Sequence, residues 1–383
     1  MTAPAIDVLL RNLQGDLKKT SPKSLFADGA PVWIYGAGNV GKDVFRVLTY
    51  RGVEVRGILD RQAKPDSAWN GIPIRLPDDP AIEVGERGRA HVIIGIFNRD
   101  VEIPPIVRLL KELGYGRITT FLDLHDHFAS ELGDRFWLTS RSYYAELEPQ
   151  IQAGYGLWAD DASRHLYAAI LKFRLAKDYE ALPAPDPANQ YFPADLPPWP
   201  TPLRFVDCGA FDGDTLQQLA ATELPVEAIA AFEPDPANFA KLAQYVRTNG
   251  SANPDSVYLY PCGVGASTSQ VRFSSGQGEG SHASLAGDSV IQCVSIDEAL
   301  PTFRPTLIKM DIEGAEDAAL RGARRTIAEH RPGLAVCVYH RPAHLWQIPL
   351  LVQQLTGGGG SYFLRSHFNN GFELVFYWLP VAC

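Results

Sequence analysis

The order of apolar runs and glycine turns constrains this chain more than any other feature. Residues 31–125 alternate short apolar runs with helical patterns, beginning with the run at 32–35. From residue 203 onward the same alternation is repeated. Strands that alternate with helices pack as parallel sheets with helices on their faces. The sequence therefore predicts an α/β fold with two such regions.

Changes in composition place the boundaries. We predict a smaller Rossmann-like α/β domain over residues 1–138, a helical and proline-rich connector over 139–202, and a second α/β domain over 203–383. The proline-rich segment 183–202 cannot hold a helix or a central strand. Near the end of the chain, two strand-like runs flank the turn-like FNNG at 368–371, which predicts an antiparallel hairpin.

Charge and cysteine content exclude several classes of protein. The formal net charge is −9 and the basic residues form no stripe, so we expect no nucleic-acid partner. No apolar run reaches the roughly 18 residues of a membrane span. The five cysteines are widely spaced and include no Cys-x-x-Cys pair, which argues against a disulfide framework or a zinc site. We expect buried thiols, no metal and a cytoplasmic location.

The first glycine loop fits a dinucleotide-binding pattern. Gly36, Gly38 and Gly41 follow an apolar run and precede a helical pattern. Asp60 ends the next strand and could bond a ribose. These four residues are a second possible nucleotide site, although the chain shows no clear set of hydride-transfer residues. A domain kept for docking or assembly is an equally good interpretation.

The second glycine loop, FVDCGAFDGDT at 205–215, has a different chemistry. We expect Gly209 to let the backbone pass close to a ligand. Asp207 and Asp212 would repel phosphates, but they suit a ligand with cationic groups, such as S-adenosylmethionine. An ordinary strand-to-helix turn is the alternative.

Two further strand ends support a ligand site at this loop. Glu233 lies at the end of the next strand, where an acid can accept hydrogen bonds from both ribose hydroxyls. Pro234 stops that strand. The following strand is predicted to end in the turn 261–264, where backbone and small side chains could flank an adenine. Three strand ends would then face one crevice, as in open α/β sheets that bind ligands.

Charged residues mark the fourth strand. Lys309, Asp311 and Glu313 alternate, so on an extended strand they share a face. Asp311 would point into the crevice, and His340 falls at the rim after the fifth strand. A structural ion pair between Lys309 and a nearby carboxylate is the alternative, and His340 could equally be an idle rim histidine.

Several ordered motifs resemble one family. They are QYF (190–192), FVDCGAFDGDT (205–215), AFEPDPANF (231–239), IKMDIEGAE (308–316) with LRGA after it, and VYHRPAHLWQIP (338–349). Together they look like the FkbM family of class I S-adenosylmethionine-dependent methyltransferases, over roughly residues 188–380. The resemblance implies a seven-stranded sheet whose last strand is antiparallel, S-adenosylmethionine as cofactor, and O-methyl transfer to a hydroxyl.

The resemblance also implies roles for individual residues. The cofactor-binding candidates are Asp207, Gly209, Phe211, Asp212, Glu233, Pro234, Cys262, Gly263 and Val264. Asp311 would sit by the transferring methyl group. We hypothesise that Asp311 or His340 accepts the proton of the acceptor hydroxyl.

The N-terminal region is similar to the small Rossmann-like domains of bacterial sugar-modifying acetyltransferases. The leading interpretation is therefore an O-methyltransferase that acts on a sugar, glycan or nucleotide-sugar hydroxyl. One alternative is an NAD-dependent oxidoreductase that uses the first glycine loop. Another is a non-catalytic nucleotide-binding scaffold. The expected partner is a small-molecule or glycan acceptor, and the sequence leaves a homo-oligomer open.

Overall fold

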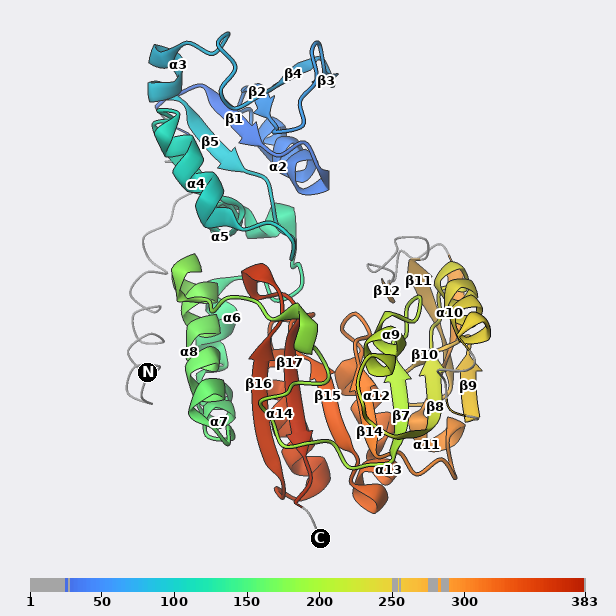
Figure 1. Ribbon diagram of the computed structural model, residues 1–383. Helices are drawn as coiled ribbons and strands as arrows, with labels where there is room; N and C mark the ends of the chain where they lie inside the picture. Colours follow the sequence, from blue (N-terminus) through green and yellow to red (C-terminus); the bar gives the residue numbers. More distant parts are fainter. Residues whose placement is uncertain are drawn as a thin grey trace. The chain divides into compact units, whose positions relative to one another are not determined.

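A computed structural model describes residues 25–26, 28–249, 254, 256–274, 282–283 and 289–381 (Figure 1). Its contacts divide the chain into two compact units. The first contains residues 1–148, 168–185 and 368–372, and the second contains 149–167, 186–367 and 373–383. The chain therefore passes between the units more than once, and the linear boundaries expected from composition remain a prediction.

The first unit is built on a six-stranded sheet in the order β3-β4-β2-β1-β5-β6. Every residue of β1 (Val32–Tyr35) and β5 (His91–Ile94) is buried, as is typical of strands covered on both faces. Strands β2 (Val55–Leu59), β4 (Ile72–Arg75) and β6 (Arg117–Thr120) continue the parallel arrangement, and β3 (Ala68–Trp69) pairs antiparallel at one edge. This sheet confirms the smaller α/β domain.

Helices flank both sides of this sheet (Figure 1). They are α2 (Asn39–Tyr50), α3 (Val84–Arg89), α4 (Ile103–Glu112) and α5 (Phe121–Leu132). The apolar residues of α4 recur at helical spacing, so Ile103, Ile106 and Leu110 are all buried in the core against the sheet.

The second unit contains a seven-stranded sheet in the order β16-β17-β15-β14-β7-β8-β9. Six of its strands run parallel and β17 runs antiparallel to both of its neighbours. The bounds are β7 (Leu203–Cys208), β8 (Val226–Phe232), β9 (Ser256–Tyr260), β14 (Leu307–Met310), β15 (Gly333–Cys337), β16 (Ser361–Ser366) and β17 (Leu374–Leu379). The predicted seven-stranded sheet with an antiparallel last strand is confirmed.

The order of these strands fixes the place of a ligand crevice. From β7 the chain moves to β8 and β9 on one side, whereas β14 and β15 lie on the other side. Such a reversal at the carboxyl ends of parallel strands leaves a crevice that open α/β sheets use for ligands. The turns after β7, β8 and β14 therefore belong to one region (Figure 1).

A small four-stranded sheet is inserted between β9 and β14. Its order is β10-β13-β11-β12, formed by β10 (Gly263–Val264), β11 (Ser269–Ser274), β12 (His282–Ala283) and β13 (Ser289–Val294). We predicted that the strand before this sheet ends in the turn 261–264. The strand β9 does end at Tyr260, but Gly263 and Val264 then form β10, which pairs with β13 in the four-stranded sheet.

Helices complete the second unit and the connector. In the second unit they are α9 (Asp214–Ala220), α10 (Pro236–Thr248), α11 (Ile296–Ala299), α12 (Glu316–Gly322), α13 (Arg324–His330) and α14 (His344–Thr356). The connector holds α6 (Arg141–Glu146), α7 (Glu148–Tyr155) and α8 (Asp161–Ala176). Within the described ranges, no helix combines the length and apolarity needed to cross a membrane.

Candidate functional site

The glycine turn after β7 is shaped by the neighbouring strand end. Gly209 has a φ of +78°, and a Cβ placed on it would lie 1.9 Å from the carbonyl oxygen of Asp311. Gly209 thus makes room for the backbone that follows β14, and its predicted closeness to a ligand remains a prediction. Asp212 lies half-buried in the same turn.

Glu233 ties the turns after β7 and β8 together. Its Oε2 accepts a hydrogen bond from the N–H of Phe211 at 3.0 Å, and its Oε1 accepts one from the N–H of Asp235 at 2.8 Å. Phe211 takes up a left-handed backbone conformation, with a φ of +47°. Burial raises the pKa of Glu233 to about 7, although the two N–H donors act in the opposite direction. The carboxylate is thus held in one orientation by the two backbone N–H groups.

The predicted adenine side is brought next to Glu233. A Cβ placed on Gly263 would lie 3.9 Å from the Cβ of Pro234, so the turn after β9 borders the turn after β8. Cys262 and Val264 on either side are both buried. Glu233, Pro234 and this turn therefore form one wall of the crevice.

Asp207, which we predicted beside a cationic ligand, lies beside the side chain of Lys309. Its carboxylate is fully buried, and Oδ1 lies 3.0 Å from the Nζ of Lys309 on the adjacent strand β14. Lys309 also donates to the carbonyl of Gly209 at 2.5 Å. Burial raises the pKa of Asp207 to about 6, although Lys309 counteracts this effect. The alternative of a structural ion pair fits this geometry, and we leave Asp207 out of the residues proposed to touch a ligand.

Asp311 lies at the crevice, where its side chain is 24% exposed. Because β14 ends at Met310, the extended strand expected through Glu313 was wrong. Glu313 instead has a φ of +53°, and its carboxylate lies 3.7 Å from the Nε2 of His340. Asp311 Oδ1 lies 3.3 Å from the same nitrogen, so both acids face one ring.

His340 is held among carboxylates. Its side chain is 1% exposed, and its Nδ1 lies 2.7 Å from the fully buried Oε1 of Glu316. Burial alone would lower the pKa of His340, but Glu316, Glu313 and Asp311 outweigh it and raise this pKa to about 10. The ring is therefore a cation near neutral pH. We predicted His340 as one of two possible proton acceptors, and this geometry disfavours that role and leaves Asp311.

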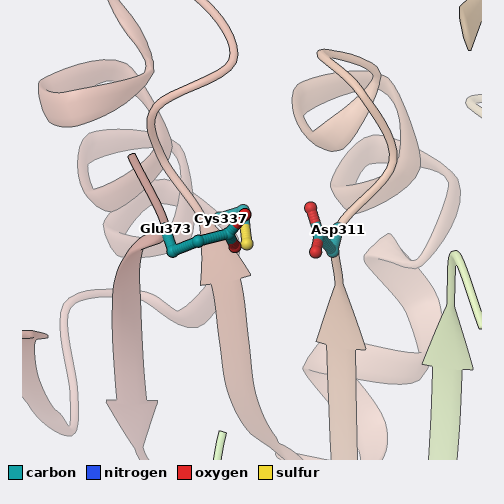
Figure 2. A group of neighbouring side chains, drawn as sticks. All are labelled: Asp311, Cys337 and Glu373. Atoms are coloured by element: carbon teal, nitrogen blue, oxygen red, sulfur yellow. The ribbon is translucent and has the colours of Figure 1, made fainter. Parts of the chain in front are cut away.

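Residues that the sequence reasoning missed surround Asp311 on its other side. Figure 2 shows Asp311, Cys337 and Glu373 at the adjoining ends of β14, β15 and β17. The hydroxyl of Tyr191, from the proline-rich segment, donates to Asp311 Oδ2 at 2.8 Å. Tyr191 belongs to the QYF motif noted above, but nothing in that motif says which group it contacts.

The residues of the first glycine loop lie close together in the first unit. A Cβ on Gly41 would lie 2.0 Å from the carbonyl oxygen of Gly36, so Gly41 allows α2 to pack close to the loop. Gly38 has open space beside it. Asp60 accepts hydrogen bonds from the N–H groups of Ala37 at 2.9 Å and Gln62 at 2.8 Å. The carboxylate therefore braces the loop, and a nucleotide role for these residues remains a prediction.

Part of the second unit matches a known protein family. Residues 207–365 match the family described as the methyltransferase FkbM domain. A methyltransferase FkbM from Methylobacillus flagellatus KT has a similar structure, with a TM-score of 0.79 and 23% sequence identity over 98% of this chain and 99% of that one. At this identity the likeness supports the fold alone. No curated protein matches the chain.

A fibrillarin from Aeropyrum pernix, solved with natively bound S-adenosyl-L-methionine, is much less similar. Its TM-score is 0.29 and its sequence identity is 12%, over 46% of this chain and 66% of that one. A likeness of this size carries no argument about the site.

Proposed function

We propose that this chain, whose residues 207–365 match the methyltransferase FkbM domain, transfers a methyl group from S-adenosylmethionine to a hydroxyl of a sugar, glycan or nucleotide-sugar. The observation that carries the proposal is the carboxylate of Glu233. It lies at the end of β8, fixed by two backbone N–H groups, where an acid can accept hydrogen bonds from ribose hydroxyls.

The charge of the crevice also suits this cofactor. S-adenosylmethionine, when bound, supplies a methyl group on a positively charged sulfur. The side chains of Asp311 and Glu313 are 24% and 23% exposed, although burial raises the pKa of Glu313 to about 7, so this second carboxyl is only partly ionised near neutral pH. Negative groups in a partly desolvated site favour a cationic ligand.

Asp311 is the residue we propose as proton acceptor. S-adenosylmethionine, when bound, would supply the methyl group to the acceptor oxygen and would leave as a neutral thioether, and Asp311 would take the hydroxyl proton. A base at this place raises the nucleophilicity of a weakly acidic alcohol. The imidazole Nε2 of His340 lies 3.3 Å from Asp311 Oδ1 and helps to orient this carboxylate. Most of the remaining catalysis comes from alignment of the reacting atoms.

The carboxylates near Asp311 also affect which acceptor can bind. Besides Asp311, the carboxylates of Glu313, Glu316 and Glu373 lie within this part of the second unit. An acceptor with a phosphate or carboxylate at its reacting end would be repelled, whereas a neutral sugar hydroxyl would not. A cytoplasmic location is part of the proposal, and the four described cysteines, all free thiols, support it.

Calorimetry separates this function from its alternatives. S-adenosylhomocysteine and NADH are each titrated into the wild type, Glu233→Ala and Asp60→Ala. The proposal expects S-adenosylhomocysteine to bind and to lose affinity only in Glu233→Ala. NADH binding that is lost only in Asp60→Ala would support an oxidoreductase. Binding of neither ligand would favour a non-catalytic scaffold.

The acceptor class requires a transfer experiment. Tritium-methyl S-adenosylmethionine is incubated with neutral sugars, nucleotide-sugars and oligosaccharides, and the products are tested for label that survives mild base. The proposal expects a base-stable methyl ether formed by wild type but not by Asp311→Asn. Label in a base-labile ester or on an amine would contradict the hydroxyl acceptor.

A further inference from the structure

The cluster of Asp311, Cys337 and Glu373 encloses a hydroxyl group. One oxygen or sulfur atom from each residue lies within 4.8 Å of the others, a spacing at which such groups can hold a metal ion (Figure 2). However, the hydroxyl oxygen of Tyr191 lies 2.8 Å from Asp311 Oδ2 and 3.6 Å from Cys337 Sγ. The Tyr191 hydroxyl therefore contacts both Asp311 and Cys337 within this cluster.

Tyr191 is fixed on several sides. Its backbone N–H donates to the hydroxyl of Tyr377 at 3.4 Å, and its carbonyl accepts from the indole N–H of Trp199 at 3.0 Å. The ammonium of Lys309 lies 5.1 Å from the centroid of its ring, a cation–π distance. The residue is 3% exposed. A side chain held in this way keeps its hydroxyl at one point.

Gln190 determines the direction in which that hydroxyl donates. Its amide nitrogen lies 3.0 Å from the Tyr191 oxygen and 2.8 Å from Glu373 Oε2. An amide NH₂ only donates, so it uses its two hydrogens on these two acceptors. The hydrogen of Tyr191 is then left for Asp311. The other oxygen of Glu373 accepts from the hydroxyl of Tyr339 at 2.9 Å, which completes the chain.

Asp311 is consequently held through both of its oxygens. Tyr191 donates to Oδ2, and Oδ1 faces the imidazole Nε2 of His340 at 3.3 Å. Burial raises the pKa of Tyr191 well above its ordinary value, and the adjacent Asp311 acts in the same direction. The Tyr191 hydroxyl therefore stays protonated, and can donate its hydrogen, near neutral pH. A carboxylate clamped from two sides has little freedom to rotate.

We propose that Tyr191 is a positioning residue for methyl transfer: its hydroxyl fixes the Asp311 carboxylate in the orientation that faces the acceptor. This inference rests on the proposed function, which assigns proton acceptance to Asp311. Tyr191, Gln190 and Glu373 all lie outside the matched residues 207–365. The complete site therefore needs the segment before the matched residues and Glu373 after them, immediately before β17.

Nuclear magnetic resonance of ¹⁵N-labelled histidine tests the orientation without an acceptor. The chain has nine histidines, and the His340 signals are assigned by their loss in His340→Gln. Asp311→Asn defines the Nε2 shift of a ring that no longer faces a carboxylate at Oδ1. The proposal expects Tyr191→Phe to move the His340 Nε2 signal at least halfway toward that position. An unchanged His340 signal in Tyr191→Phe would overturn it.

Tyr167→Phe is the matched control, because Tyr167 is also a buried phenol and donates a single hydrogen bond, to the carbonyl of Ile151 at 2.8 Å. Its spectrum is expected to superimpose on that of wild type at His340. A shift equal to that of Tyr191→Phe would show a general loss of packing and overturn the inference. If Tyr191→Phe does not fold, Gln190→Met takes its place, and the His340 signal is expected to move in the same direction by a smaller amount.

Binding and turnover separate this inference from the proposed function. S-adenosylhomocysteine is expected to bind Tyr191→Phe within about threefold of wild type, since the phenol contacts Asp311 rather than the Glu233 wall. Turnover of a methylated acceptor should fall at least tenfold with little change in KM. An NMR shift without any methyl transfer in wild type would leave the clamp intact and count against the function alone. Unchanged turnover in a folded Tyr191→Phe that transfers methyl groups would count against the clamp.

Discussion

The ammonium of Lys309 lies 3.0 Å from the carboxylate of Asp207, and side-chain exposures of 2% and 0% place the pair inside the sheet of the second unit. Lys309→Met leaves a buried carboxylate without its counter-charge. We expect this change to lower the free energy of unfolding by about 3–5 kcal/mol in urea titrations. Lys241→Met, at an exposed position of α10, should change it by less than about 0.5 kcal/mol. Equal effects of the two substitutions would contradict a structural role for the pair.

Gly209 gives a second stability prediction. A methyl group at this position would meet the carbonyl oxygen of Asp311 at 1.9 Å and would sit on a backbone with a φ of +78°. We expect Gly209→Ala to destabilise the second unit by about 2 kcal/mol or more. At Gly265 the nearest neighbour of an added Cβ is at 3.8 Å, so Gly265→Ala should cost less than about 1 kcal/mol. Thermal unfolding followed by circular dichroism would compare the stabilities of the two variants. A loss of less than about 1 kcal/mol in Gly209→Ala would count against the close approach of the two strand ends.

The raised pKa of Glu233 predicts that cofactor binding depends on pH. Burial raises its pKa to about 7, so the carboxylate is ionised above this pH and increasingly protonated below it. Only the ionised form offers both oxygens as acceptors to ribose hydroxyls. We expect the Kd of S-adenosylhomocysteine to be flat above about pH 8 and to rise toward tenfold per pH unit below about pH 6.

Glu233→Gln is the control for this dependence. It cannot ionise, so its affinity should be weaker at pH 8 and nearly constant between pH 5.5 and 8, a range chosen to bracket the pKa of about 7. Calorimetry at matched ionic strength measures both proteins. A wild-type Kd that does not change with pH would argue against the contact between Glu233 and the ribose.

Substitution of Asp311 tests whether this residue accepts the proton of the acceptor hydroxyl. Asp311→Asn keeps an oxygen for the hydroxyl of Tyr191 but removes the base. We expect single-turnover methyl transfer to slow by about 100-fold or more, while S-adenosylhomocysteine binds within about threefold of wild type. Rapid-quench measurements with labelled S-adenosylmethionine give both quantities. Full activity of Asp311→Asn would require another base.

The sequence predicted those parts of the fold and site that depend on local patterns. Alternating apolar runs and glycine turns predicted both sheets, and the terminal hairpin agreed with the antiparallel strand β17. Glu233 could be placed because a strand end and a following proline mark its position. The proline-rich segment was predicted to hold no helix or central strand. Over residues 183–202 the structure has no strand, but it forms the short 3₁₀ helix Pro187–Asn189.

Contacts between distant segments could not be predicted in the same way. Tyr191 reaches Asp311 across 120 positions of sequence, and Gln190 reaches Glu373 across 183. No periodicity records such pairs, because they depend on how the strands are ordered in the sheet. For the same reason the sequence left the role of His340 open between a base and an idle rim histidine: Glu316, which contacts its Nδ1, lies on a different element. Sequence spacing gave the strand ends, and packing decided what each side chain contacts.

Photochemical cross-linking tests the central claim, that the cofactor binds at the ends of β7 and β8 in the second unit. Methyl-labelled S-adenosylmethionine is irradiated with the wild-type chain, and the labelled peptides are mapped by mass spectrometry, with excess S-adenosylhomocysteine as competitor. We predict competitor-sensitive label in peptides that contain residues 207–215 or 231–239, and its loss in Glu233→Ala. Competitor-sensitive label confined to residues 33–62, around the first glycine loop, would contradict the account.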